Sequence, residues 1–155
     1  MAVLDLLDLP GAMAARAPLV GLDLGEKTIG VAVSDTSWMI ASPLALIRRT
    51  KFTADAGELL KLMDGRGAGG LVIGLPVNMD GTEGPRAQST RAFARNLARL
   101  TELPIALWDE RLSTAAVERE LIGADVSRGK RKAVIDQHAA VFILQGALDR
   151  LLRAG

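Results

Sequence analysis

The chain has 155 residues, enough for one domain with a sizeable core, and its hydrophobic content is 49% with only 3% aromatics, so aliphatic side chains must fill that core. Nineteen basic and eighteen acidic residues give a net charge of +1, which favours no particular class of partner. Cysteine is absent and His138 is the single histidine, which excludes disulfides, cysteine- or histidine-rich zinc sites and nearly every Ser-His or Cys-His catalytic arrangement. The lack of cysteine fits a cytoplasmic location, and no apolar stretch approaches the roughly 20 residues of a membrane span.

The first eighteen residues do not form a typical signal peptide. They lack a basic start, and Asp5 and Asp8 interrupt the apolar run. We expect residues 1–18 to be a variable, partly helical N-terminal extension that precedes a domain spanning 19–155.

The segment GLDLGEKTIGVAVSD, residues 21–35, comes within one residue of a phosphate-binding P-loop. Glu26 replaces the glycine that should precede the lysine, and the following residues 28–34 alternate and are β-branched, which predicts a strand instead of the required helix. The segment is therefore predicted to be a β-hairpin with a tight turn at 25–27. Asp23 then lies within an apolar strand, where a charge is costly unless it is paired or bound to a cation.

The rest of the chain alternates between the two kinds of element. The pattern predicts strands at 39–47, 70–77 and 104–108, and helices at 54–63, 85–100, 113–122 and 134–152. Pro43 suits an edge strand, and the basic stretch 127–132 is expected to be a link before the last helix. The order βββαβαβαα predicts an α/β fold with a mixed five-stranded sheet, in which an antiparallel meander is followed by parallel strands and helices pack on the faces.

Acidic residues occur at three separate positions of this order. Asp23 lies in the first strand, Asp109 and Glu110 end the last strand, and Asp136 lies near the start of the final helix. On the final helix, Asp136 shares a face with residues that are mostly small, namely Ala139, Ala140, Ile143 and Ala147. If the first, fourth and fifth strands are parallel neighbours, their carboxyl ends meet at one edge of the sheet, where open α/β sheets place their sites. The acids would then converge.

Converging carboxylates repel one another unless a pKa rises or divalent cations neutralise them. All-carboxylate ligation suits Mg²⁺ or Mn²⁺, and two such ions are the recurring arrangement for attack of water on a phosphodiester. Each acid also has an ordinary explanation: Asp109 as a turn or cap residue, and Asp136 as a charge that the helix dipole favours. The mid-strand position of Asp23 is the hardest to explain in that way.

Four segments of the chain together resemble the YqgF family: GLDLGEKTIGVAVSD, VIGLPVNMDGTEGP, WDERLSTAAVE and GKRKAVIDQHAAVFIL. The resemblance covers about residues 19–150. Members of this family have a ribonuclease H-like fold and are described as Holliday-junction resolvases and as nucleases that mature the 5′ end of pre-16S rRNA. The resemblance implies a hydrolase, namely a metal-dependent endonuclease that acts on phosphodiester bonds in the cytoplasm.

The resemblance also implies roles for individual residues. Asp23, Glu110 and Asp136 match the family's catalytic acids and would hold two Mg²⁺ or Mn²⁺ ions. Asp109 is the alternative ligand to Glu110, because alternation along a strand points the two in opposite directions. His138, next to the last acid, replaces a small residue of the family pattern, and we expect it to be an ordinary polar residue near the site.

Basic residues around these acids are candidates for binding the nucleic-acid backbone. They are Lys27, Arg111, Arg128, Lys130, Arg131 and Lys132. Arg91, Arg95 and Arg99 share one helix face, which is more typical of a solvated surface. The low aromatic content favours recognition of backbone and shape over stacking on bases.

The expected partner is precursor rRNA, with the ribosome as a further partner. The alternative is branched DNA, and cutting a four-way junction symmetrically predicts a two-fold homodimer where rRNA processing would accept a monomer. Two functions of other classes compete. ATP hydrolysis of the actin-like sugar-kinase type requires two such domains, and a non-catalytic RNA-binding module should not depend on the three acids.

Overall fold

The computed structural model describes residues 3–112 and 128–154, with side chains in the second range from His138 onward. Its strands are β1 (Val3–Asp5), β2 (Leu19–Leu24), β3 (Thr28–Ser34), β4 (Ala41–Arg48), β5 (Gly70–Leu75) and β6 (Ile105–Asp109). Its helices are η1 (Leu6–Asp8), α1 (Leu9–Ala12), α2 (Phe52–Arg66), α3 (Pro85–Ala98), η2 (Glu110–Leu112) and α5 (Arg128–Ala154). The predicted helix at 113–122 falls outside the described residues.

The strands form one mixed sheet in the order β1-β6-β5-β2-β3-β4. β2, β3 and β4 are an antiparallel meander, while β2, β5 and β6 are parallel neighbours, because helices connect them. These pairings confirm the predicted mixed topology. β4 lies at the edge of the sheet, where Pro43 is tolerated and where a bulge interrupts its pairing with β3.

The sheet has a sixth strand that the sequence analysis did not predict. β1 comes from the N-terminal segment and pairs in parallel with β6, with Val3 opposite Ile105. The short helices that follow bury Leu6 and Leu9 completely or almost completely in the core on the α5 side. The strand count of five was therefore wrong, because apolar residues between 3 and 9 add to both the sheet edge and the core.

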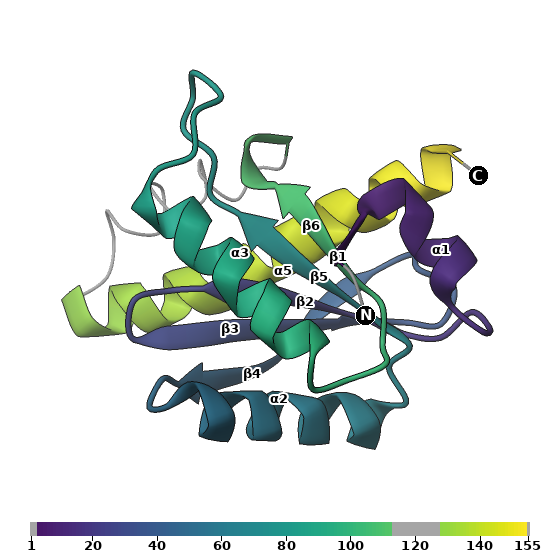
Figure 1. Ribbon diagram of the computed structural model, residues 1–155, viewed down its shortest axis with the longest axis horizontal. Helices are drawn as coiled ribbons and strands as arrows, with labels where there is room; N and C mark the ends of the chain where they lie inside the picture. Colours follow the sequence, from purple (N-terminus) through teal and green to yellow (C-terminus); the bar gives the residue numbers. More distant parts are fainter. Residues whose placement is uncertain (1–2, 113–127, 155) are drawn as a thin grey trace.

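Helices cover both faces of the sheet, as Figure 1 shows, with α3 on one face and α5 on the other. The core under α5 contains Val72, Ala106 and Trp108 from the strands, together with Ala140, Ile143 and Leu144 from the helix. The core on the opposite face joins α2 and α3 to side chains that include Val20, Leu22 and Ile73. Neighbouring residues of a strand thus serve different cores, as the alternation of side chains requires.

The last helix begins earlier than predicted, at Arg128, so most of the basic stretch 127–132 belongs to α5 and is not a link. Arginine and lysine are good helix formers, which compensates for Gly129 within this stretch. None of the described helices, α5 included, combines the length and apolar character needed to cross a membrane.

Candidate active site

Asp23 lies on the α5 face of the sheet, close to the carboxyl end of β2. Gly21, two residues earlier on the same face, is so near α5 that a Cβ added there would lie 2.7 Å from Cβ of Leu144. Asp23 is 1% exposed. On one side it pairs with Gly30 of β3. On the other side, Leu22 is in register with Ile73 of β5, so the next residue of β5, Gly74, lies beside Asp23. Two glycines therefore flank this buried carboxylate.

Glu110 reaches the same face from β6. It follows the last residue of that strand, is 5% exposed, and its side chain lies over Gly74. A Cβ added at Gly74 would lie 3.2 Å from Cγ of Glu110 and 3.0 Å from Cγ1 of Ile143 in α5. Glu110 and Asp23 consequently lie on the same side of the sheet, on either side of the glycine position in β5.

Asp109 points the other way and has a partner. Its neighbour Trp108 belongs to the core under α5, so alternation turns Asp109 toward the opposite face. Arg111 donates hydrogen bonds to both of its carboxylate oxygens, with Nη2 2.7 Å from Oδ2 and Nε 3.1 Å from Oδ1. This hydrogen bonding is the main cause that lowers the pKa of Asp109, against an opposing effect of burial, and it raises the pKa of Arg111.

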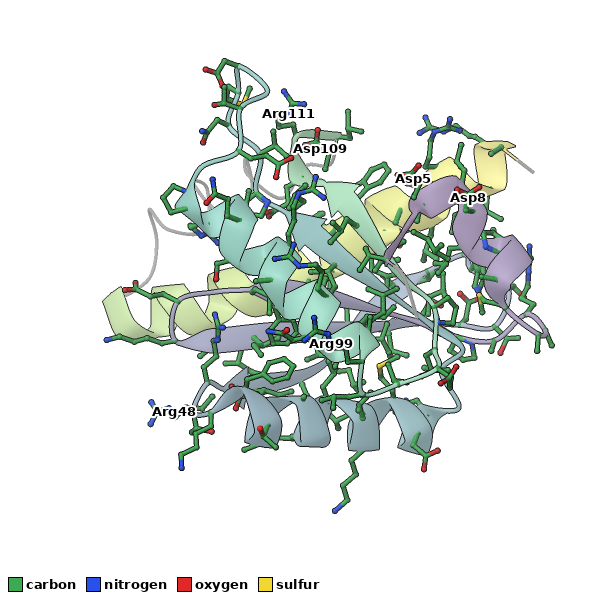
Figure 2. All side chains as sticks on the ribbon, viewed as in Figure 1. Asp5, Asp8, Arg48, Arg99, Asp109 and Arg111 are labelled. Atoms are coloured by element: carbon green, nitrogen blue, oxygen red, sulfur yellow. The ribbon has the colours of Figure 1, made fainter. Side chains whose placement is uncertain are left out.

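Arg111 also approaches the loop that follows β5. Its Nη1 lies 3.4 Å from the carbonyl oxygen of Met79, a long hydrogen bond. Figure 2 shows Asp109 and Arg111 together, close to the loop that follows β5. Arg111 was predicted to bind the nucleic-acid backbone, and in the described part of the chain it balances the charge of Asp109.

The third predicted acid, Asp136, belongs to α5, but its side chain falls outside the described residues. Its place on the helix is one turn before Ala140, whose carbonyl oxygen would lie 3.3 Å from a Cβ at Gly21. The side chains of Arg128, Lys130, Arg131 and Lys132 also fall outside the described residues. His138 is exposed. Among the described side chains, which do not include that of Asp136, no three histidines, cysteines or acids lie close enough together to hold a metal ion.

The turn that follows Asp23 carries Lys27, which is exposed. Two arginines that the sequence analysis did not single out bind the carbonyl groups leading into this turn. Arg86 in the first turn of α3 donates from Nη2 to the oxygen of Leu24 (3.2 Å), and Arg49 after β4 donates from Nη1 to that of Gly25 (2.7 Å). No sequence motif marks either contact, because each joins segments far apart in the chain.

The arginine stripe on α3 behaves as a solvated surface. Arg91 forms a salt bridge with Glu83 at 2.6 Å, which lowers the pKa of that carboxylate, and Arg95 and Arg99 are exposed. In Figure 2, Arg99, the residue directly after α3, lies well away from Asp109 and Arg111.

The fold defined by this sheet is ribonuclease H-like. It matches the solved structure titled "T. thermophilus RuvC in complex with Holliday junction substrate" over 88% of this chain and 96% of that chain, with a TM-score of 0.53 and 10% sequence identity. A second structure, titled "Thermus thermophilus RuvC structure", matches with a TM-score of 0.50 and 12% identity over the same shares of the two chains. At these identities the similarity shows the fold alone.

The family follows from sequence. A family model described as "RuvX: Holliday junction resolvase" matches residues 17–150. A protein of Phenylobacterium zucineum named "Putative pre-16S rRNA nuclease" is 69% identical over 97% of this chain and 98% of its own. One of the same name from Rhodopseudomonas palustris is 66% identical over 96% of this chain and 93% of its own. The chain belongs to the RuvX/YqgF family of nucleases, which confirms the resemblance drawn from its four segments.

Proposed function

We propose that this protein is a metal-dependent endonuclease that hydrolyses a phosphodiester bond in 5′-end maturation of pre-16S rRNA in the cytoplasm. The observation that carries the proposal is the placement of Asp23 and Glu110, both buried, on one face of the sheet at the carboxyl ends of parallel strands. Open α/β sheets bind their ligands at this edge. The names of the relatives support pre-16S rRNA as the substrate.

The chemistry of the acids fits a divalent cation. Asp23 and Glu110 offer carboxylate oxygens, the ligands that Mg²⁺ and Mn²⁺ prefer, and they sit on a strand and at a strand end, which hold their positions firmly. Asp136 supplies the third carboxylate of the proposed set. Two ions bound there would supply positive charge to the attacking water and to the phosphoryl oxygens. Asp109 is not part of this set, because Arg111 engages both of its oxygens.

The chain's own residues then orient the substrate. The carboxylates fix the reaction position on the α5 face, and the exposed Lys27 lies a few residues beyond Asp23. The basic residues at the start of α5, Arg128, Lys130, Arg131 and Lys132, would contact backbone phosphates and add to the attraction for nucleic acid. Arg111 would do the same only through donors that remain after its bonds to Asp109. Precursor rRNA could be presented alone or on the ribosome.

A second candidate substrate is a four-way DNA junction. Two findings favour it: the family model is described as a Holliday junction resolvase, and the fold is that of RuvC. This function requires two symmetric cuts and hence a two-fold dimer, whereas rRNA maturation by a single cut does not.

The test is cleavage of precursor 16S rRNA and of a mobile four-way DNA junction side by side, with Mg²⁺ or Mn²⁺. We expect Asp23→Asn and Glu110→Gln to reduce rRNA cleavage by on the order of 100-fold or more, a loss typical of removing preorganised electrostatic stabilisation. Asp64 is an exposed carboxylate in the last turn of α2, and the matched control Asp64→Asn should cleave normally. Paired symmetric cuts in the junction alone would establish the resolvase. Binding without cleavage of either substrate would leave a non-catalytic RNA-binding module.

A further inference from the structure

Two arginines from distant segments hold the chain directly after Asp23. Arg49 donates from its main-chain N–H to the oxygen of Lys27 (2.8 Å) and from Nη1 to the oxygen of Gly25 (2.7 Å). Arg86 donates from Nη2 to the oxygen of Leu24 (3.2 Å). A strand advances about 3.3 Å per residue, so these carbonyls lie roughly 3 to 7 Å along the chain from Asp23. Both guanidinium groups are therefore close to the edge of the sheet where the proposed reaction occurs.

Within the described part of the chain, both guanidinium groups keep most of their hydrogen-bonding capacity. A guanidinium has five N–H donors in a planar fork that matches phosphate, and each of these two uses one donor in a hydrogen bond to protein among the described residues. The salt bridges found in that part of the chain involve Arg91 and Arg111, not Arg49 or Arg86. Arg49 is half-buried and Arg86 is exposed, so solvent and ligands reach both.

The surrounding charge is mostly positive. Lys27 and Arg48 are exposed, and Arg48 pairs with Thr28 across the β3–β4 ladder, directly after the turn. Glu26 at the tip of the turn opposes them with one negative charge. In Figure 1 the β2–β3 turn and the beginnings of α2, α3 and α5 all lie at the same end of the molecule. Among the described side chains around the turn, Lys27, Arg48, Arg49 and Arg86 thus outnumber the exposed acid Glu26, which suits a polyanion.

We propose that Arg49 and Arg86 form a phosphate clamp that holds the nucleic-acid backbone on the α2–α3 side of the cleaved bond. The inference rests on the proposed nuclease function and specifies where its substrate runs. Asp23 and Glu110 face α5, whereas Arg86 belongs to a helix on the opposite face. The backbone accordingly crosses the edge of the sheet from one face to the other. The bonds to Leu24 and Gly25 fix the guanidinium groups before the substrate arrives, which lowers the entropic cost of binding.

The test must separate phosphate binding from bracing of the turn, since the arginines do the latter in any case. We would measure the dissociation constant of a fluorescein-labelled single-stranded RNA between 50 and 200 mM salt, with Mg²⁺ and in the Asp23→Asn background to prevent cleavage. The logarithm of the association constant falls linearly with the logarithm of the salt concentration, and each lost phosphate contact should make this slope less steep by about 0.7 for a single strand. We expect a decrease of about 1.4 for Arg49→Gln with Arg86→Gln, and of about 0.7 for Arg86→Gln alone.

Two controls complete the design. The Arg49→Lys, Arg86→Lys double variant keeps both charges and should keep most of the slope. Arg66→Gln removes an exposed arginine from the last turn of α2, at the other end of that helix, and should leave the slope unchanged. Because Arg86 is exposed, its single variant should fold even if a change at Arg49 does not, and a thermal melt checks both.

The outcomes distinguish the clamp from the function on which it rests. Suppose that the protein with Asp23 intact cleaves RNA, but the slope is unchanged in Arg86→Gln and in the double variant. This result would refute the clamp alone, and the arginines would then only brace the turn. If the Asp23-containing protein neither binds nor cleaves RNA, the proposed function fails and the clamp fails with it. A reduced slope with a normal melting temperature would support the clamp.

Discussion

Replacing Gly74 by alanine tests the packing that places Glu110. Gly74 lies in β5 between the two strands that carry the proposed acids, and an added Cβ there would overlap the Cδ1 methyl of Ile143 and lie 3.0 Å from its Cγ1. Ile143 is completely buried, so it has little room to move away. Overpacking costs about 1–3 kcal/mol and the stiffer alanine backbone returns about 0.4–1 kcal/mol, which predicts a net loss of up to about 2.6 kcal/mol, centred near 1 kcal/mol, in the free energy of unfolding.

The double variant Gly74→Ala, Ile143→Val should recover part of this loss. Ile143→Val alone removes a buried methyl and should cost about 0.5–1.5 kcal/mol. In the double variant the same change removes the atom that the new Cβ overlaps, so the two effects should be non-additive by about 1 kcal/mol in the favourable direction. Urea denaturation of the four proteins of the cycle, at constant m value, measures this coupling.

Cleavage should behave differently from stability in this cycle. The new Cβ would also lie 3.2 Å from Cγ of Glu110, a contact that Ile143→Val does not relieve. The carboxylate should shift by a few tenths of an ångström, and since a 1 Å misplacement can cost 100-fold, we expect about tenfold slower cleavage in both proteins that carry Gly74→Ala. Additive stability changes, or cleavage that returns together with stability in the double variant, would refute this account of how Glu110 is positioned.

Three further substitutions test other contacts of the fold and of the site. Gly21→Ala brings a Cβ to 2.7 Å from α5, against atoms that cannot rotate away, and should lower the unfolding free energy in urea by at least about 1–3 kcal/mol. Asp55→Ala leaves the main-chain N–H of Thr50 without its buried acceptor (3.1 Å) and should cost about 1–3 kcal/mol, measured in the same way. Arg111→Gln should raise the pKa of Asp109 toward 3.8 in an NMR titration. Because that pKa is lowered in the folded protein, the pair stabilises above about pH 3.8, and the unfolding free energies of variant and wild type should converge as pH falls through the lowered pKa.

The strand order was predictable because its signals are local. The alternation in 28–34 indicates a hairpin, and helices between the later strands require parallel pairing. β1 was missed because three residues carry no periodicity, and its partner β6 lies about a hundred positions further along the chain. The early start of α5 was missed because a run of basic residues is equally typical of a solvated link and of a helix.

Within the site, the sequence left Asp109 and Glu110 undecided for a physical reason. Alternation shows that the two point to opposite faces, but both preceding residues, Leu107 and Trp108, are apolar and gave no sign of which face each one uses. The packing of Trp108 under α5 and the position of Glu110 over Gly74 assign the faces. The two arginines at the turn were beyond reach for another reason, since main-chain carbonyl groups accept hydrogen bonds whatever the residue type.

The interior around Asp23 is poorly arranged for stability alone, and this is the strongest physical argument for a function there. Two carboxylates are buried on a face that otherwise packs apolar side chains against α5, and burial of such groups is costly unless charge or hydrogen bonds compensate. Gly30 and Gly74 beside Asp23 add backbone entropy to the unfolded chain and no side-chain packing to the folded one. Two buried carboxylates side by side at the carboxyl edge of parallel strands are typical of residues selected for chemistry and not for stability.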